Sequence, residues 1–564
     1  MSRKKPVRLE SLTYVRQRLP GSVGYPRRPR RSNPTPPESP LALNLPAAES
    51  HPEARSRWSL AALEVACITL IFAAQAAWPP PDVNEPHYLG KAKHFWNQEW
   101  AEHDFFFNSA DTHRAFYVAL GWLTRWLELP QVAWCGRLAT WLLLAWAWRR
   151  LSWTIAPKPG WAILSGALFL TLNAGYQMAG EWVVGGFEAK GLAYVLVFLA
   201  LGELARGRWN AALAICGAAS ALHVLVGGWS TVAIGCCWLL SAGERPALVR
   251  LGPGLLGGLL LALPGLLPGL ALNSGIDAET AAMAHEIYVF KRLKHHLVPQ
   301  AFPIRLIVAQ LVMVLAWFVL CELVPCEERL RRIRKFVLGA LSIELAGVCV
   351  SLFANIYPAA TAALLRLYWF RLADAMLPLG IALAAAAAFS TGRRARAAGA
   401  VCLAASLALA AYRHQDYAIT KGFDGPPRAD KPGKALDHAD WQAACQWAAE
   451  HTPADALFLT PRNAQTFTWY AGRGQVVSWK DLPQDARAIV AWWKRLEEIY
   501  GSPAPEIQGM WLESLSERSP GELRRLGAKY GADYLLTEAE PPLALPRLYQ
   551  NNSYAAYDLG GGAD

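Results

Sequence analysis

Long apolar stretches recur along the chain between residues 60 and 412. A helix that crosses a membrane needs about 20 mostly apolar residues. The pattern predicts about 11 such spans, at 60–78, 132–148, 161–177, 190–205, 210–226, 227–242, 251–271, 302–323, 336–354, 369–389 and 397–412. The stretch 113–129 is also apolar, but Arg125 interrupts it, which is typical of a helix that lies in the membrane interface.

Basic residues alternate along the loops between these spans. Loops on the cytoplasmic side of a membrane carry an excess of Lys and Arg. Clusters such as "WRRL" at 148–151, "EERLRRIRK" at 327–335 and "GRRAR" at 392–396 therefore predict the cytoplasmic side. The external loops are then 79–131, 178–190, 272–301 and 355–368.

The two ends of the chain differ from the middle. Residues 1–58 are rich in Arg, Pro and Ser, which predicts a disordered, basic cytoplasmic tail. Residues 59–412 form the predicted transmembrane bundle. Residues 413–564 alternate helical and strand patterns and predict an external α/β domain. Helices are expected at 440–451, 486–500 and from 523, and strands at 456–460, 476–480 and up to 537.

Composition agrees with an α-helical polytopic membrane bundle. The chain is 53% hydrophobic and only 18% charged, and so much apolar surface exceeds what one soluble core encloses. The net charge of +11 is concentrated in the tail and the short loops. This distribution indicates membrane topology and contact with membrane lipids, and argues against nucleic-acid binding. The cysteines lie mostly within apolar stretches and are interpreted as core residues.

The external loops carry the candidate chemistry, because ionisable groups near lipid usually face a wet cavity or one another. The first two loops offer mainly acids and histidines, and the later loops offer bases. A hydroxyl could be activated where such acids and bases meet beside an anionic lipid headgroup. The candidates are Asp82, Glu85, His87, Asp111, His113, Glu188, Lys190, Lys291, Arg292, Arg366 and Arg371.

Each candidate also has a purely structural interpretation. Asp82 and Glu85 have the spacing of a helix capping box. Arg371 and Asp374 are three apart on a predicted helix and could form an internal ion pair instead of binding phosphate. The basic run 291–296 could rest on phospholipid headgroups. These alternatives stay open at the level of sequence.

The layout resembles the GT-C superfamily of membrane glycosyltransferases, which take sugars from polyprenyl-phosphate carriers. "DVNEPHYLGKAKHF" stands where that superfamily has an acidic motif in its first external loop. "GYQMAGEWVVGGFEAKGLAY" is similar to the stretch of oligosaccharyltransferase catalytic subunits that ends in Asp-Asn-Glu-Gly. Glu188 then takes the place of the aspartate, and Lys190 replaces a metal-binding glutamate. The layout is also similar to a bacterial membrane-protein family for which no substrate is implied.

The resemblance implies an inverting glycosyltransferase of the bacterial inner membrane, with a cytoplasmic N-terminus and a periplasmic C-terminal domain. Asp82 or Glu85 would be the general base and Glu188 a further catalytic acid. The remaining candidates would bind a polyprenyl-phosphate-linked sugar and an acceptor of unknown identity. Lys190 argues against a divalent ion, so no metal ligands are assigned and no cofactor is expected to be required.

Two other classes of function fit parts of the pattern. A non-catalytic scaffold with the same architecture would explain why Lys190 replaces an acid. A transporter would explain charged loops, but its ionisable residues should line the spans near the membrane midplane. Here the charges gather at the ends of the spans, which favours the glycosyltransferase.

Overall fold

A computed structural model describes residues 52–325, 327–390, scattered positions between 397 and 408, 428–430, 438–502 and 511–560. Most of the predicted basic tail, the "GRRAR" cluster and most of the last predicted span lie outside these residues. So does the first part of the predicted C-terminal domain. Those predictions, and the boundaries of the three predicted regions, therefore stay predictions.

Ten helices coincide with ten of the predicted spans. They are α1 (Pro52–Ala76), α4 (Leu129–Ile155), α5 (Trp161–Tyr176), α6 (Ala189–Ala205), α7 (Trp209–Leu222), α8 (Val224–Leu239), α9 (Gly252–Ala271), α12 (Ile304–Leu323), α13 (Glu328–Ser351) and α15 (Arg371–Phe389). Within the described residues, four helical stretches are long and apolar enough to cross a membrane: 58–76, 248–271, 304–323 and 371–389. Helices α5, α7 and α8 are apolar but shorter. The chain is thus a mostly helical protein with several candidate spans, and the count of about 11 stays a prediction.

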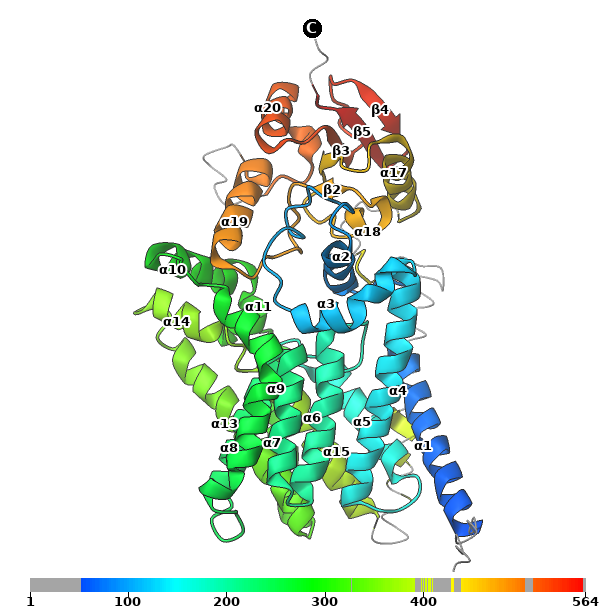
Figure 1. The fold of residues 1–564 in the computed structure, drawn as a ribbon, viewed down its shortest axis with the longest axis vertical. Coiled ribbons are helices and arrows are strands. Elements are labelled where there is room, and N and C mark those ends of the chain that lie inside the picture. Colours follow the sequence, from blue (N-terminus) through cyan, green and yellow to red (C-terminus); the bar gives the residue numbers. More distant parts are fainter. Residues whose placement is uncertain are drawn as a thin grey trace, which may run out of the picture. The chain divides into compact units, whose positions relative to one another are not determined.

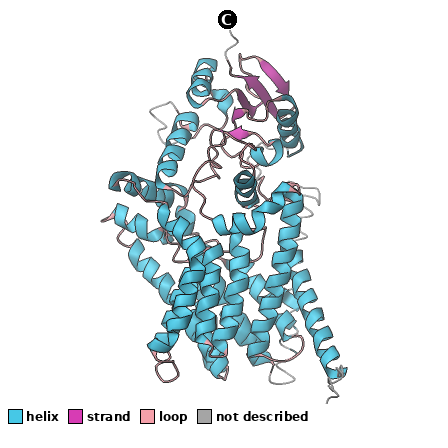
Figure 2. Cartoon of the chain, in the orientation of Figure 1, coloured by secondary structure: helices cyan, strands magenta, loops and turns pink. Residues whose placement is uncertain are grey.

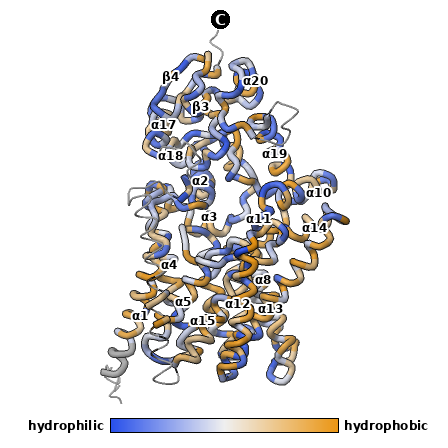
Figure 3. The backbone as a smooth tube through the Cα atoms, turned by 180° about the vertical axis from the view of Figure 1, so that it is seen from behind, coloured by the Kyte–Doolittle hydropathy of each residue, from blue (hydrophilic) through white to orange (hydrophobic). Residues whose placement is uncertain are grey.

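The helices pack closely where small residues meet. Helix α7 packs against α6 and α9, and α13 packs against α8 and α15 (Figure 1). A Cβ atom added to Gly217 of α7 would lie 2.0 Å from the carbonyl oxygen of Gly258 on α9. Only glycine permits this approach of two backbones. Helix α15 is mostly buried, whereas α9 and α12 expose apolar side chains, as expected of helices that face lipid. Figure 3 shows that hydrophobic residues predominate along the helices of the bundle.

Short helices fill the predicted external loops. They are α2 (Glu85–Trp96), α3 (Arg114–Leu120), η1 (Gly121–Arg125), α10 (Ala278–Glu286), η3 (Ile287–Arg292), α11 (Lys294–Leu297), η4 (Pro299–Ala301) and α14 (Pro358–Leu365); η2 (Leu248–Leu251) precedes α9. The stretch 113–129 contains α3 and η1, of 7 and 5 residues. Both are far too short to cross a membrane. This agrees with the prediction that the stretch does not span, and its place in the interface stays a prediction.

The C-terminal region contains a mixed five-stranded sheet with helices (Figure 2). The strand order is β2-β1-β3-β5-β4; β1 pairs in parallel with β2 and β3, whereas β5 is antiparallel to β3 and β4. The α/β character predicted from the sequence is present. The elements are α17 (His438–His451), β1 (Leu457–Leu459), α18 (Phe467–Ala471), β2 (Gly474–Gln475), α19 (Ala486–Tyr500), η6 (Leu515–Glu517), α20 (Pro520–Tyr530), β3 (Tyr534–Glu538), β4 (Arg547–Gln550) and β5 (Tyr554–Asp558).

One predicted strand is wrong. Residues 476–480 form a loop, because β2 ends at Gln475. Pairing with β1 ends at the Val476 amide, which donates to the Phe458 carbonyl at 3.0 Å, and beyond it tertiary contacts satisfy the backbone. The Trp492 indole donates to the Ser478 carbonyl at 2.9 Å, and the Tyr500 hydroxyl donates to the Val477 carbonyl at 3.2 Å. A β-rich sequence pattern cannot reveal that tertiary contacts replace the ladder.

The first loop is tied to the sheet of the C-terminal region by Asp104. Its carboxylate accepts hydrogen bonds from the backbone amides of Phe107, at 3.0 Å, and Gln475, at 3.2 Å. The Phe105 amide donates to the Gln475 carbonyl at 3.3 Å. The loop that carries Asp82 is therefore held against the edge of the sheet at β2.

Candidate active site

Asp82 and Glu85 lie in the turn before α2 and are both buried. The Asp82 amide donates to Glu85 Oε2 at 2.7 Å, which is half of the predicted capping box. The other half is absent, because Asn84 is the N-cap of α2 and Asp82 Oδ1 accepts from the Val83 amide instead. Asp82 Oδ2 is buried without a hydrogen-bond partner among the described residues. The Arg428 guanidinium lies 3.5 Å from Oδ1. Asp82 thus keeps one free carboxylate oxygen.

Glu85 is fully engaged. Arg137 of α4 donates to both carboxylate oxygens, at 2.7 and 2.5 Å, and the Phe187 amide donates to Oε1 at 2.8 Å. Both side chains are 0% exposed. Gly186 packs directly against this pair of acids, because a Cβ atom added to it would lie 2.8 Å from Asp82 Cβ and 3.0 Å from Glu85 Oε1. Glu85 therefore fixes the loop 181–188 against α2 and α4.

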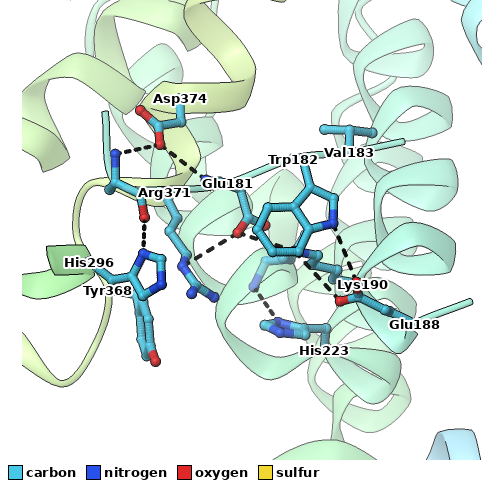
Figure 4. Close-up of polar contacts among 12 residues, drawn as sticks. Glu181, Trp182, Val183, Glu188, Lys190, His223, His296, Tyr368, Arg371 and Asp374 are labelled. Carbon is cyan, nitrogen blue, oxygen red and sulfur yellow. Dashed lines mark hydrogen bonds and ion pairs between the residues drawn. The ribbon is translucent and has the colours of Figure 1, made fainter. Parts of the chain in front are cut away.

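Glu188 and Lys190 begin helix α6. Lys190 Nζ lies 3.6 Å from Glu188 and 3.9 Å from Glu181, and 3.6 Å from the centroid of the Trp182 indole (Figure 4). Asn84 and Trp182 donate to Glu188 at 3.1 and 3.3 Å. Burial raises the pKa of Glu188, and the Lys190 charge opposes that rise. One ammonium group thus faces two buried carboxylates.

Arg371 approaches the same cluster from the start of α15. Its Nε lies 3.4 Å from Glu181 Oε2, and its guanidinium lies 3.9 Å from the centroid of the Tyr368 ring (Figure 4). Neither Arg371 Nε nor Glu181 Oε2 has a hydrogen-bond partner within the described part of the chain. The Tyr194 hydroxyl takes the other oxygen of Glu181, at 3.1 Å. This ion pair is therefore loose at one edge.

A cavity lies at that loose edge. It measures about 10 Å³, room for roughly one water molecule. Its polar side is formed by Glu181, Arg371 and the tyrosines, and its apolar side by α8 and α15. The lining residues are Glu181, Tyr194, His223, Leu225, Val226, Trp229, Tyr368, Arg371 and Leu372. At this size the cavity suits a water molecule that hydrogen-bonds to its polar side.

Asp374 holds the loop that presents Glu181. Its carboxylate accepts hydrogen bonds from the amides of Met178 and Ala179, both at 2.8 Å, and of Glu181 at 3.2 Å. Gly180 adopts a φ of +77°, the left-handed conformation that such a turn needs. Arg371 pairs with Glu181 rather than with Asp374. The alternative of an internal Arg371–Asp374 ion pair is therefore wrong.

Of the other candidates of the first loop, His113 reaches the cavity, because its ring centroid lies 5.4 Å from that of His223, which lines it. His87 and Asp111 have other neighbours. His87 Nδ1 lies 3.9 Å from Asp481 of the C-terminal region. Burial lowers the pKa of His87 well below its usual value and raises the pKa of Asp481 to about 7, so the contact is between largely neutral groups near pH 6. His113 contacts Tyr88 at 3.3 Å, and burial lowers its pKa to about 4. Asp111 lies 3.8 Å from Lys91.

Three predicted phosphate-binding cations instead meet the segment 479–497. Arg292 donates to the Trp479 carbonyl at 2.9 Å, and Arg366 donates to the Gln484 carbonyl. Lys291 lies 3.9 Å from Glu497. Of the predicted bases, only Lys190 and Arg371 join the acids around the cavity. The described residues contain no group of three or more His, Cys, Asp or Glu side chains that could hold a metal ion.

Sequence reasoning missed Arg137, Glu181 and the two tyrosines of the site. A lone arginine within an apolar stretch is a recognisable sign of a buried ion pair, and Arg137 could have been found that way. Glu181 is one of the ionisable residues of "GEWVVGGFEAKG", but its role becomes apparent only once its partner Arg371, 190 positions away, is known. Tyr194 and Tyr368 carry no sequence signal that separates them from core aromatic residues.

Comparisons with known proteins do not assign this chain to a family of known function. Residues 439–499, from α17 to α19, match a family described as Domain of unknown function (DUF6798). No curated protein matches the chain. The chain is similar to the crystal structure of the Archaeoglobus fulgidus oligosaccharyltransferase in complex with Zn and sulfate, at 12% identity and a TM-score of 0.39, over 84% of this chain and 67% of that one. No residue role follows from a likeness this low.

Proposed function

We propose that the protein is an inverting membrane glycosyltransferase that moves a sugar from a polyprenyl-phosphate carrier to an acceptor hydroxyl at the external membrane face. The observation that carries the proposal is the cluster around the cavity. There the free edges of Glu181 and Arg371 face an amphipathic space. Asp82, with its free oxygen, lies close enough to Glu188 to raise the pKa of that carboxyl. The topology, with the C-terminal domain external on a bacterial inner membrane, belongs to the same proposal.

Asp82 is the proposed general base. Its Oδ2 takes the proton of the acceptor hydroxyl, while the hydroxyl oxygen forms a bond to the anomeric carbon of the sugar. The bond from that carbon to the phosphate oxygen breaks, and its electron pair leaves with the polyprenyl phosphate. Attack opposite the leaving group inverts the anomeric carbon. Glu85 cannot serve as readily, because Arg137 and two backbone amides occupy its oxygens.

Arg371 and Lys190 would stabilise the negative charge that grows on the leaving phosphate. The planar guanidinium of arginine suits phosphate oxygens, and Arg371 Nε has only the long 3.4 Å contact to Glu181 and no hydrogen bond among the described residues. A phosphate is larger than the cavity, so its entry requires Tyr368 or Trp229 to move aside. Lys190 supplies a fixed positive charge beside Glu188 and Glu181. We therefore expect that transfer requires no divalent cation and that a chelator leaves it unchanged.

Native mass spectrometry of the full chain in nanodiscs tests this proposal. The discs contain undecaprenyl phosphate and phosphatidylglycerol, and the variants are Asp82→Asn and Arg371→Ala. Wild type and Asp82→Asn should both retain undecaprenyl phosphate in preference to phosphatidylglycerol. Arg371→Ala should retain at least tenfold less, because the phosphate loses its bidentate partner. Arg331→Ala is the matched control, since Arg331 forms a half-exposed ion pair with Glu244.

A second readout separates catalysis from binding. Asp82→Asn extracted with its native lipids should carry sugar-loaded polyprenyl phosphate, whereas wild type should carry the discharged carrier. If Arg371→Ala retained as much undecaprenyl phosphate as wild type does, the donor site would be refuted. If neither wild type nor Asp82→Asn carried sugar-loaded polyprenyl phosphate, although both still bound the carrier specifically, transfer would be refuted.

A non-catalytic scaffold is the second candidate, and one observation favours it. The Lys190 ammonium already neutralises the acids that would otherwise act on a substrate. A scaffold predicts that Asp82→Asn changes neither the bound lipid nor its sugar load. The difference between loaded and discharged carrier therefore decides between the two.

A further inference from the structure

A second cluster with unpartnered donors lies in the C-terminal region. Three half-buried tryptophans, Trp479, Trp493 and Trp511, have ring centroids 5.6 to 6.4 Å apart. The Arg462 guanidinium lies 5.6 Å from the Trp479 ring and 5.3 Å from the Trp511 ring. We call these four residues the tryptophan–arginine patch. Nothing in the proposed transfer step uses them.

Two hydrogen-bond donors of the patch are unsatisfied. Arg462 Nε and Trp493 Nε1 are buried, and neither has an acceptor among the residues that the structure describes. A buried N–H without a partner is unfavourable, so native proteins rarely keep one without a ligand or water that accepts its hydrogen bond. Two in one aromatic cluster point to an absent ligand that offers oxygen acceptors.

The charge around the patch is positive. Arg292 of η3 lies 5.0 Å from the Trp479 ring, and Lys291 lies 4.5 Å from the Trp493 ring. Glu497, 3.9 Å from Lys291, is the acid in contact with these cations. Arginine and lysine on aromatic faces favour an anionic ligand, while the indole rings themselves favour the flat face of a sugar. The combination fits a sugar that carries a carboxylate or phosphate.

The patch is connected to the cavity through one short helix. Tyr288 and Arg292 lie one turn apart on η3. Arg292 contacts the patch, whereas the Tyr288 hydroxyl lies 2.9 Å from that of Tyr368. Tyr368 in turn stacks on Arg371. A molecule held at the patch and one held at the cavity would therefore meet opposite ends of η3.

We infer that the tryptophan–arginine patch binds an acidic sugar unit of the acceptor, an inference that rests on the proposed glycosyl transfer. Arg462 and Trp493 donate to its carboxylate or phosphate oxygens, and the indoles of Trp479 and Trp511 pack on its ring. Arg292 and Lys291 add the charge that draws it in.

Binding can be measured without any donor. The full chain in nanodiscs made of a zwitterionic lipid is titrated with oligogalacturonate, an acidic oligosaccharide, and with maltooligosaccharide of matched length, using tryptophan fluorescence. Wild type should bind the acidic oligosaccharide at least tenfold more tightly than the neutral one. Arg462→Gln should weaken that binding about tenfold or more, and Arg462→Lys should restore little, because lysine lacks the planar fork.

Trp493→Phe isolates one donor, since it removes Nε1 and keeps an aromatic ring; it should weaken binding by a few fold. Arg487→Gln is the matched control, because Arg487 lies on α19 and its exposed guanidinium donates to the Gly275 carbonyl at 3.0 Å. Equal affinity for both oligosaccharides, or wild-type affinity in Arg462→Gln, would overturn the inference. The inference would also be overturned if the protein bound phosphatidylglycerol vesicles more tightly than the acidic oligosaccharide and the same variants abolished that binding. The patch would then be a site for lipid headgroups.

These outcomes are separable from those of the transfer proposal. Carrier retention depends on Arg371, and oligosaccharide binding depends on Arg462. If the protein bound the acidic oligosaccharide but never discharged a carrier, the inference about the patch would stand and the proposed glycosyl transfer would be refuted.

Discussion

Two pairs of glutamate and arginine, Glu85–Arg137 and Glu181–Arg371, differ in how completely their polar atoms are hydrogen-bonded. Glu85 and Arg137 meet through two short hydrogen bonds, and backbone amides take up more of the carboxylate. Glu181 and Arg371 meet through a single 3.4 Å contact beside a cavity, with one atom of each unpartnered in the described structure. The closed pair holds elements together, whereas the open pair is the one that we propose binds a ligand.

Removing one partner of the closed pair should have the largest effect on stability. Arg137→Met leaves the Glu85 charge buried without a counterion, which typically costs about 3–5 kcal/mol. Arg371→Met should cost about 1 kcal/mol or less, because Lys190 still faces Glu181. Thermal unfolding of both variants in the same detergent compares them. A smaller loss for Arg137→Met than for Arg371→Met would reverse the comparison.

Transfer activity should depend most on Asp82, which contributes little to stability. Asp82→Asn removes the free carboxylate oxygen and should lower transfer by roughly 100-fold or more, with an unfolding midpoint close to wild type. Glu85→Gln should lower the midpoint as well, since Arg137 loses its charged partner. Discharge of the lipid-linked sugar, measured beside unfolding, separates a base from a positioning residue. Loss of activity in Glu85→Gln alone, at full stability, would transfer the role of base to Glu85.

Asp481 extends the comparison to a buried acid that lies 3.9 Å from a histidine, His87. Its pKa is raised to about 7 by burial, against the ordinary value of 3.8, while Ser478, Lys480 and Arg292 oppose the rise and Asp104 adds to it. Between these two pH values the folded chain holds a proton that the unfolded chain has lost. Stability from Asp481 is therefore full below about pH 4 and is lost as the pH rises through 7.

His87 acts with the opposite sign, because burial and the charges of Lys91, His113, Lys480 and Arg292 lower its pKa. It contributes stability above its unfolded pKa of about 6.5 that is lost as the pH falls. Asp481→Asn should make the decline in unfolding midpoint between pH 5 and 7 smaller, because the raised pKa of Asp481 contributes to that decline. An unchanged profile in Asp481→Asn would mean that this carboxyl is already ionised in the folded chain.

Much of the helical framework could be predicted from the sequence, because apolar stretches of 15 to 25 residues leave a strong local signal. The C-terminal helix 486–500 was predictable for the same reason, since its apolar and polar positions alternate with helical periodicity. Strand 476–480 failed because its backbone is satisfied by Trp492 and Tyr500 from α19. Such long-range contacts leave no trace in a short window of sequence.

The candidate site was predictable only in part. The sequence placed Asp82, Glu188, Lys190 and Arg371 at span ends, and the structure brings the last three into one cluster, with Asp82 near Glu188. It could not show that Arg371 pairs with Glu181, or that Arg292 and Arg366 donate to carbonyls of residues 479 and 484. Charge type and span position indicate that a residue is functional or paired. Choosing between the two requires the partner, which only the fold supplies.

The smallest expected effect tests the exposed edge of the site. Arg428 lies 3.5 Å from Asp82 Oδ1, and its side chain is 40% exposed. Ion pairs with an exposed partner contribute at most about 1 kcal/mol, so Arg428→Gln should leave the unfolding midpoint unchanged. Transfer should fall by a few fold at most, because Asp82 Oδ2, the proposed base atom, does not contact Arg428. A stability loss as large as that of Arg137→Met would place Asp82 with Glu85 among the closed, structural acids.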